Sequence, residues 1–135
     1  MGNPLTIVIC DDEEIAISIV SASVEALFTS RGIQTEIESF TSPGKCFEYI
    51  RKNDVNLLFL DIAMPEEDGI ELGKQIMELK EEDCPEIVFV SSNQDRVFDS
   101  FAVHPYYTYK HGNCAVFNIF FIFFLVFYFN GSRNF

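Results

Sequence analysis

Apolar runs and helix-like stretches alternate along most of the chain. Continuous apolar runs at residues 5–10, 55–60 and 86–90 predict buried strands. Residues 33–40 instead alternate apolar and polar side chains, which predicts a half-exposed strand at a sheet edge. The intervening segments predict helices over 14–31, 43–52, 68–80 and 95–103, followed by a last strand over 106–110.

The first predicted helix carries an apolar stripe. Ile15, Ile19, Ala22 and Ala26 recur at helical spacing, so they are predicted to form its inner face. Gly32 follows the stripe and is typical of a helix end.

Strands and helices joined by short links indicate right-handed crossovers and a parallel sheet covered on both faces. Continuous apolar runs are typical of the central strands of such a sheet. The sequence therefore predicts a doubly wound α/β domain with a five-stranded parallel sheet in the order 2-1-3-4-5.

Length, charge and cysteine content limit the classes of protein to which this chain can belong. A chain of 135 residues suits one domain, and 21 acidic against 9 basic residues give a net charge of −12. Nucleic-acid contact by this chain is not expected, because phosphate binding needs a clustered basic face. The four cysteines are too widely spaced for a zinc site; they are Cys10, Cys46, Cys84 and Cys114. The N-terminus has no signal-peptide pattern, so the protein is expected in the cytoplasm, where its thiols would be free.

Acidic and hydroxyl side chains follow three of the predicted strands. Asp11 and Asp12 end the first, Asp61 ends the third, and Ser91 ends the fourth. Each alone also fits a helix cap or a turn. All lie at the carboxyl edge, where open α/β sheets form sites. Asp11, Asp12 and Asp61 follow the first and third strands, between which strand order reverses, so they are predicted to converge. Two carboxylates at ~4 Å repel by about 4 kcal/mol at an effective dielectric of 20. A Mg²⁺ ion, which prefers oxygen ligands, would relieve that repulsion.

The same acids indicate a chemistry. Asp61 cannot give both oxygens to a metal, and a free carboxylate oxygen beside Mg²⁺ can accept a phosphoryl group as an acyl phosphate. A hydroxyl at Ser91 and an ammonium from the fifth strand would hold the phosphoryl oxygens.

Three motifs carry a family resemblance: IVICDDE at 7–13, LLFLDIAMPEEDG at 57–69 and IVFVSS at 87–92. They resemble the receiver domain of two-component response regulators, a flavodoxin-like fold, over residues 4–107. FDSFAVHPYY at 98–107 further resembles the LytTR-type branch of transcriptional regulators. The resemblance implies a phosphorelay protein that accepts phosphate from a sensor histidine kinase, and not an enzyme.

The resemblance also assigns roles. It implies that Asp61 is the phosphoacceptor, that Asp12 ligates Mg²⁺ directly, and that Asp11 acts through water. It implies a third ligand from the backbone carbonyl of Ala63. Ser91 would follow the phosphoryl group, and an aromatic side chain, Tyr106 or Tyr107, would change rotamer with it.

The family's strand-five lysine is out of place here. Counting without gaps from Ser91 puts that position on His111, with Lys110 one residue early. Neighbouring strand residues face opposite sides of a sheet, so one step matters. Lys110 is the preferred candidate, and Tyr107 is its accompanying switch aromatic. The receiver domain is predicted to span residues 4–111.

Residues 112–135 form a tail unlike a fifth receiver helix, because the run 114–129 has no charge. It could be a membrane anchor, a buried or aggregation-prone strand, or the product of a shifted reading frame in an A/T-rich gene. The last is preferred, and it predicts that another reading frame of the gene encodes a conventional strand-five lysine, a fifth helix and a basic DNA-binding domain. No DNA-binding domain is expected in this chain. Loss of the fifth helix would also alter a surface through which receivers pair into dimers.

Two other functions stay open. An aspartate-nucleophile phosphohydrolase would place a second acid at position 63, which is Ala63. An inert interaction module would keep the fold without accepting phosphate.

Overall fold

The computed structural model describes residues 2–90, 109–111 and 114–117. The predicted strands and helices up to residue 90 are all present, with ends shifted by a few residues. The predicted helix over 95–103 lies outside the described residues. In chain order the elements are β1 Leu5–Cys10, α1 Glu14–Ser30, β2 Thr35–Phe40, α2 Pro43–Lys52, β3 Leu57–Asp61, α3 Gly69–Leu79, β4 Glu86–Val90, β5 Tyr109–His111 and β6 Cys114–Phe117.

The sheet confirms the predicted fold class. Its first four strands lie in the order β2-β1-β3-β4, and each neighbouring pair is parallel. Strand order reverses between β1 and β3, since the chain moves outward to β2 and then crosses back. The carboxyl ends of β1 and β3 are therefore neighbours, which is where the sequence predicts the site.

The sheet differs from the prediction beyond β4. The strand predicted over 106–110 was expected to lie beside β4, but β6 pairs there, parallel to β4. β5 lies outside β6 and runs antiparallel to it, so the described residues contribute six strands to the sheet rather than the five predicted. The link between β5 and β6 explains the direction, because it holds only residues 112–113. So short a link can join antiparallel strands but is too short for a parallel crossover.

Part of the predicted tail thus belongs to the sheet. Residues Cys114–Phe117 form β6, and the apolar, β-branched and aromatic side chains of this run favour a strand. The rest of the tail lies outside the described residues, so the predicted boundary after residue 111 stays a prediction. None of the helices in the described part of the chain is long and apolar enough to cross a membrane.

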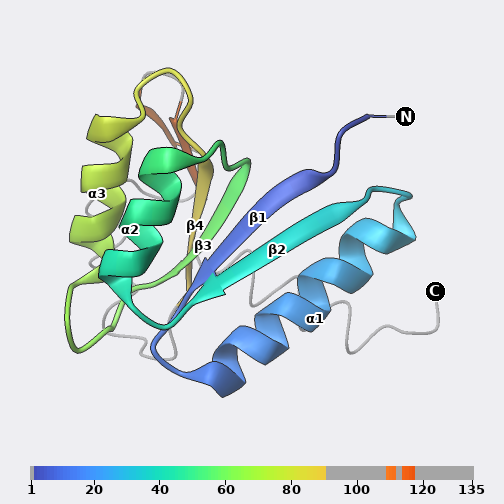
Figure 1. Ribbon diagram of the computed structural model, residues 1–135, viewed down its shortest axis with the longest axis horizontal. Helices are drawn as coiled ribbons and strands as arrows, with labels where there is room; N and C mark the ends of the chain where they lie inside the picture. Colours follow the sequence, from blue (N-terminus) through green and yellow to red (C-terminus); the bar gives the residue numbers. More distant parts are fainter. Residues whose placement is uncertain (1, 91–108, 112–113, 118–135) are drawn as a thin grey trace.

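Helices cover both faces of the sheet (Figure 1). α2 and α3 pack together on one face, over a core that includes Leu58, Leu60 and Phe89. α1 covers the other face, where it packs over Ile7 and Ile9 of β1. The strand residues alternate between these two cores, as side chains of a strand covered on both faces must.

The inner face of α1 is not the predicted one. Val20 and Val24 are its buried residues. Ile15 is 76% exposed and Ile19 is 52% exposed, and Ala22 and Ala26 on the same stripe are also exposed. The prediction failed because this helix is apolar on more than one side, so spacing alone does not choose the buried side.

Local features define the ends of two helices and one edge of the sheet. The hydroxyl of Ser42 accepts the N–H of Lys45 at 3.4 Å at the start of α2. Gly32, with φ of 72°, follows α1 in the left-handed conformation that glycine adopts without strain. β2 lies at the edge of the sheet and exposes Glu36 and Glu38.

The cysteines differ from one another. Cys10 and Cys46 are free and buried, as expected for thiols in a reducing environment. Cys84 takes part in a disulfide, so the expectation of free thiols is wrong for this residue.

Candidate functional site

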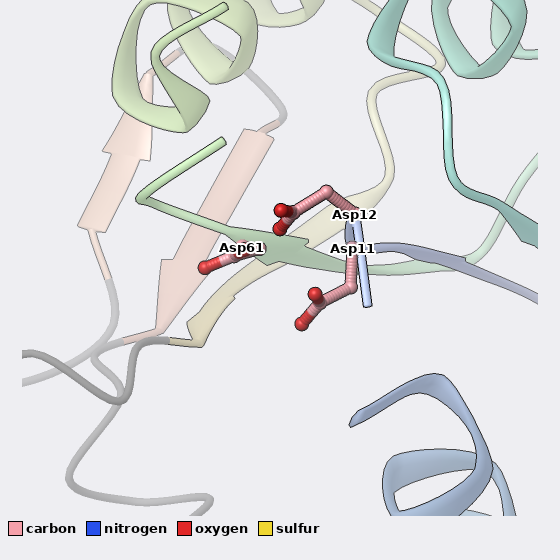
Figure 2. A group of neighbouring side chains, drawn as sticks. All are labelled: Asp11, Asp12 and Asp61. Carbon is pink, nitrogen blue, oxygen red and sulfur yellow. The ribbon is translucent and has the colours of Figure 1, made fainter. Parts of the chain in front are cut away.

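Three aspartates meet at the carboxyl edge of the sheet (Figure 2). Asp11 and Asp12 follow β1, and Asp61 is the last residue of β3. Each offers one carboxylate oxygen such that these oxygens lie within 4.8 Å of one another. Asp11 and Asp61 are buried, at 7% and 8% exposure, whereas Asp12 is exposed. The predicted convergence of the strand-end acids is therefore present in the structure.

Backbone contacts fix the carboxylate of Asp61. The N–H of Ala63 donates to its Oδ1 at 3.1 Å, which sets the rotation of the carboxylate. Behind it, the N–H of Gly69 donates to the carbonyl of Ile62 at 2.9 Å, so α3 begins directly against the end of β3. A Cβ on Gly69 would lie 1.9 Å from the Asp61 carbonyl oxygen. Only glycine fits there.

The Asp11 carboxylate is also tied to backbone. Its Oδ1 accepts the N–H of Glu13 at 2.9 Å, just before α1 begins. At the start of α3, Oδ1 of Asp68 accepts the N–H of Ile70 at 2.8 Å, so Asp68 caps that helix, as its position before Gly69 predicts.

Crowding raises the proton affinity of the buried acids. Burial raises the pKa of Asp61 to about 7, and the neighbouring charges of Asp11 and Asp12 add to the effect. Burial likewise raises the pKa of Asp11, and the charge of Asp12 acts in the same direction. The Ala63 N–H opposes the rise at Asp61 because it stabilises the ionised carboxylate.

This electrostatic picture fits a cation site. Carboxylates that repel one another in a small buried volume favour a hard divalent cation, and Mg²⁺ takes oxygen ligands of this kind. Asp11, Asp12 and Asp61 are the residues that would hold it. The backbone carbonyl of Ala63, the third predicted ligand, belongs to the residue whose N–H already contacts Asp61.

Of the three other predicted site residues, the structure describes only the backbone of Lys110. Ser91 and Tyr107 lie outside the described residues, although Val90 pairs directly with Asp61 in the sheet. Lys110 lies in β5, at the far edge of the sheet.

The strand register gives the separation between Lys110 and the acids. Lys110 lies opposite Ala115, at the level of Glu86, four residues before Val90. That offset is about 13 Å along the strands at ~3.3 Å per residue. Three strand spacings add about 14 Å across the sheet at ~4.8 Å each. The backbone of Lys110 thus lies both across the sheet and along the strands from the end of β3.

Sequence reasoning missed a sulfur contact beside the acids. The Cys10 thiol donates to Sδ of Met64 at 3.8 Å, and both side chains are buried. A hydrogen bond with Cys46 raises the pKa of Cys10, with burial adding to the effect. No spacing rule links two residues so far apart in the chain. The one signal in the sequence is that a sulfur-containing residue lies next to each acidic motif: Cys10 before Asp11, and Met64 three residues after Asp61.

A profile of the response regulator receiver domain matches residues 7–104. The chain belongs to the response regulator receiver domain family. That match spans both acidic motifs and most of the described sheet. It agrees with the resemblance of the motifs and with the observed strand order.

Solved structures show the same fold. One relative is a two component transcriptional regulator AraC from Clostridium phytofermentans, with 27% identity, coverage of 70% of this chain and 72% of that chain, and a TM-score of 0.57. A CheY-like receiver domain from Methanospirillum hungatei has 19% identity, covers 76% of each chain and has a TM-score of 0.62. Response regulator TrrA from Thermotoga maritima, in complex with Mg(2+)-BeF, has 21% identity, coverage of 70% and 76%, and a TM-score of 0.55. No curated protein sequence matches the chain.

Proposed function

We propose that this receiver domain accepts a phosphoryl group from a sensor histidine kinase onto Asp61, with Mg²⁺ bound by the acidic cluster. The observation that carries the proposal is the meeting of Asp11, Asp12 and Asp61, with Asp61 buried at the end of β3. The family assignment supports a role as a phosphoacceptor rather than as an enzyme.

The reaction is a transfer between two nucleophiles. A carboxylate oxygen of Asp61 attacks the phosphorus of a phosphohistidine, the phosphorus–nitrogen bond breaks, and the imidazole nitrogen leaves with the electron pair. Asp61 must be ionised to attack, so a group that titrates near neutral pH reacts best once the cluster is deprotonated. Bound Mg²⁺ supplies positive charge that offsets the charge on the phosphoryl oxygens. Ala63 holds the attacking carboxylate in one orientation.

Ser91 is the proposed hydroxyl partner of the phosphoryl group. It directly follows Val90, which pairs with Asp61 in the sheet, and this adjacency supports the proposal. Tyr107 is proposed as the aromatic residue that responds to phosphorylation. Because β5 lies at the far edge of the sheet, the proposal relies on the metal rather than on Lys110 for positive charge.

The exposed stripe of α1 suits contact with the kinase. Ile15 and Ile19 lie in the first turns of a helix that begins two residues after Asp12. A donor that brings a phosphoryl group to the carboxyl edge of the sheet would sit next to this apolar surface. Exposed apolar patches mark interaction sites in globular proteins.

The downstream role is proposed to be transcriptional control in the cytoplasm, because residues 98–107 resemble LytTR-type regulators. The acidic charge of −12 supports the view that this chain does not itself contact nucleic acid. Pairing with a second receiver is part of the same proposal.

Intact mass spectrometry after incubation with a small phosphodonor tests the proposal. The wild-type chain with Mg²⁺ should gain one phosphoryl group, and the Asp61→Asn variant or the wild type in EDTA should gain none. Rapid multiple turnover of the donor without an adduct would support a phosphohydrolase. Neither adduct nor turnover would support an inert interaction module.

A further inference from the structure

The loop after β3 is closed at both of its ends. The N–H of Ile62 donates to the carbonyl of Val90 at 2.9 Å, and Ala63 forms an isolated antiparallel bridge with Asp68. Between that bridging pair, Met64 is the only buried residue. Its side chain is 7% exposed and belongs to the core beneath α2 and α3.

Met64 contacts β1, the strand that directly precedes Asp11 and Asp12. Its Sδ accepts the Cys10 thiol at 3.8 Å, and Cys10 is the residue directly before Asp11. Met64 itself lies three residues after Asp61. The contact therefore joins the end of β1 to the loop after β3, through residues that lie one and three positions from acids of the cluster.

We propose that Met64 is a positioning residue for the acidic cluster: by packing against Cys10, it sets the separation of the Asp11–Asp12 pair from Asp61. Carboxylates that repel one another move apart unless the backbone beneath them is held, and Mg²⁺ demands near-ideal geometry. The inference rests on the proposed Mg²⁺-dependent function. A purely structural role would instead make Met64 one more core side chain, whose loss weakens the fold and leaves the affinity of the folded protein for Mg²⁺ unchanged.

Two measurements on the same variants separate these roles: the Mg²⁺ dissociation constant from calorimetric titration, and the free energy of unfolding in EDTA. Met64→Ala should weaken Mg²⁺ binding about tenfold or more, in the range known for residues that support metal ligands. Met64→Leu keeps the apolar volume and should recover most of the affinity. Ile76→Ala removes a fully buried side chain further along α3, and should lower stability but not Mg²⁺ affinity.

A double-mutant cycle tests the contact itself. Cys10→Ala should also weaken Mg²⁺ binding, and adding Met64→Ala should weaken it little further, since both changes remove one contact. Wild-type affinity in Met64→Ala, or fully additive losses, would overturn the inference while leaving the proposed function intact. A wild-type protein that binds no Mg²⁺ would overturn the proposed function and the inference with it.

Discussion

The protonation of Asp61 should control the stability of the metal-free domain. Burial and the neighbouring carboxylates raise its pKa from 3.8 to about 7. A carboxyl group whose pKa is higher in the folded state binds its proton more tightly there than in the unfolded chain. Its contribution to stability is present below the unfolded pKa and is lost as the pH rises through the folded pKa. The metal-free protein therefore loses stability between about pH 4 and pH 7 through this group.

The size of the effect follows from the shift. A difference of about three pKa units corresponds to on the order of 4 kcal/mol, at about 1.4 kcal/mol per unit, as an upper bound. Asp61→Asn keeps a neutral side chain of the same shape at every pH. The variant should match the wild type near pH 4 and exceed it by up to about 4 kcal/mol at pH 8 in EDTA.

Urea unfolding followed by far-ultraviolet circular dichroism measures this difference, and linear extrapolation gives the free energy of unfolding. Asp54→Asn is the control, because Asp54 is exposed and precedes the amino end of β3, whereas Asp61 is the last residue of that strand. Adding Mg²⁺ at pH 8 should stabilise the wild type and stabilise Asp61→Asn much less. Equal stability of the wild type and Asp61→Asn at pH 8 would refute the electrostatic account. A stability difference that stays the same at every pH would also refute it.

Three further predictions concern packing, docking and transfer. Gly69→Ala should lower the free energy of unfolding by about 3 kcal/mol and abolish Mg²⁺ binding in calorimetry, because its Cβ would overlap backbone at the end of β3. In the control Gly44→Ala, the Cβ would meet only a side-chain oxygen at 3.9 Å. That variant should keep Mg²⁺ binding and should keep its stability or gain about 0.5 kcal/mol. Ile15→Lys should slow phosphorylation by the kinase about tenfold without changing reaction with a small phosphodonor, whereas Leu79→Lys, an exposed apolar residue at the other end of the fold, should change neither rate. Ser91→Ala should slow phosphorylation by a small donor about a hundredfold at unchanged stability, and an unchanged rate would remove this hydroxyl from the site.

Sequence patterns predicted the sheet best where the strands are most buried. The apolar runs around Val8, Leu58 and Val88 allow one interpretation, because only a strand covered on both faces explains them at that length. The convergence of Asp12 with Asp61 followed from strand order alone, since parallel strands bring their carboxyl ends to one edge.

The predictions failed where local pattern allows two packings. On α1, apolar side chains occupy more than one side, and the sheet chose Val20 and Val24 over the stripe that begins at Ile15. Beyond β4, the segments around Lys110 and Val116 are both compatible with a strand, and pairing with β4 selected the more apolar one. Such choices depend on the tertiary surface that each segment meets, and no single segment carries that information.

The edge strand β2 bears on the behaviour of the protein at high concentration. Among the described residues, β2 pairs only with β1, and an open strand edge can template fibrous association with other chains. Glu36 and Glu38 project from that edge strand, so two copies brought together along it would meet like charge against like charge. Repulsion between these glutamates therefore disfavours edge-to-edge association of two copies of the domain.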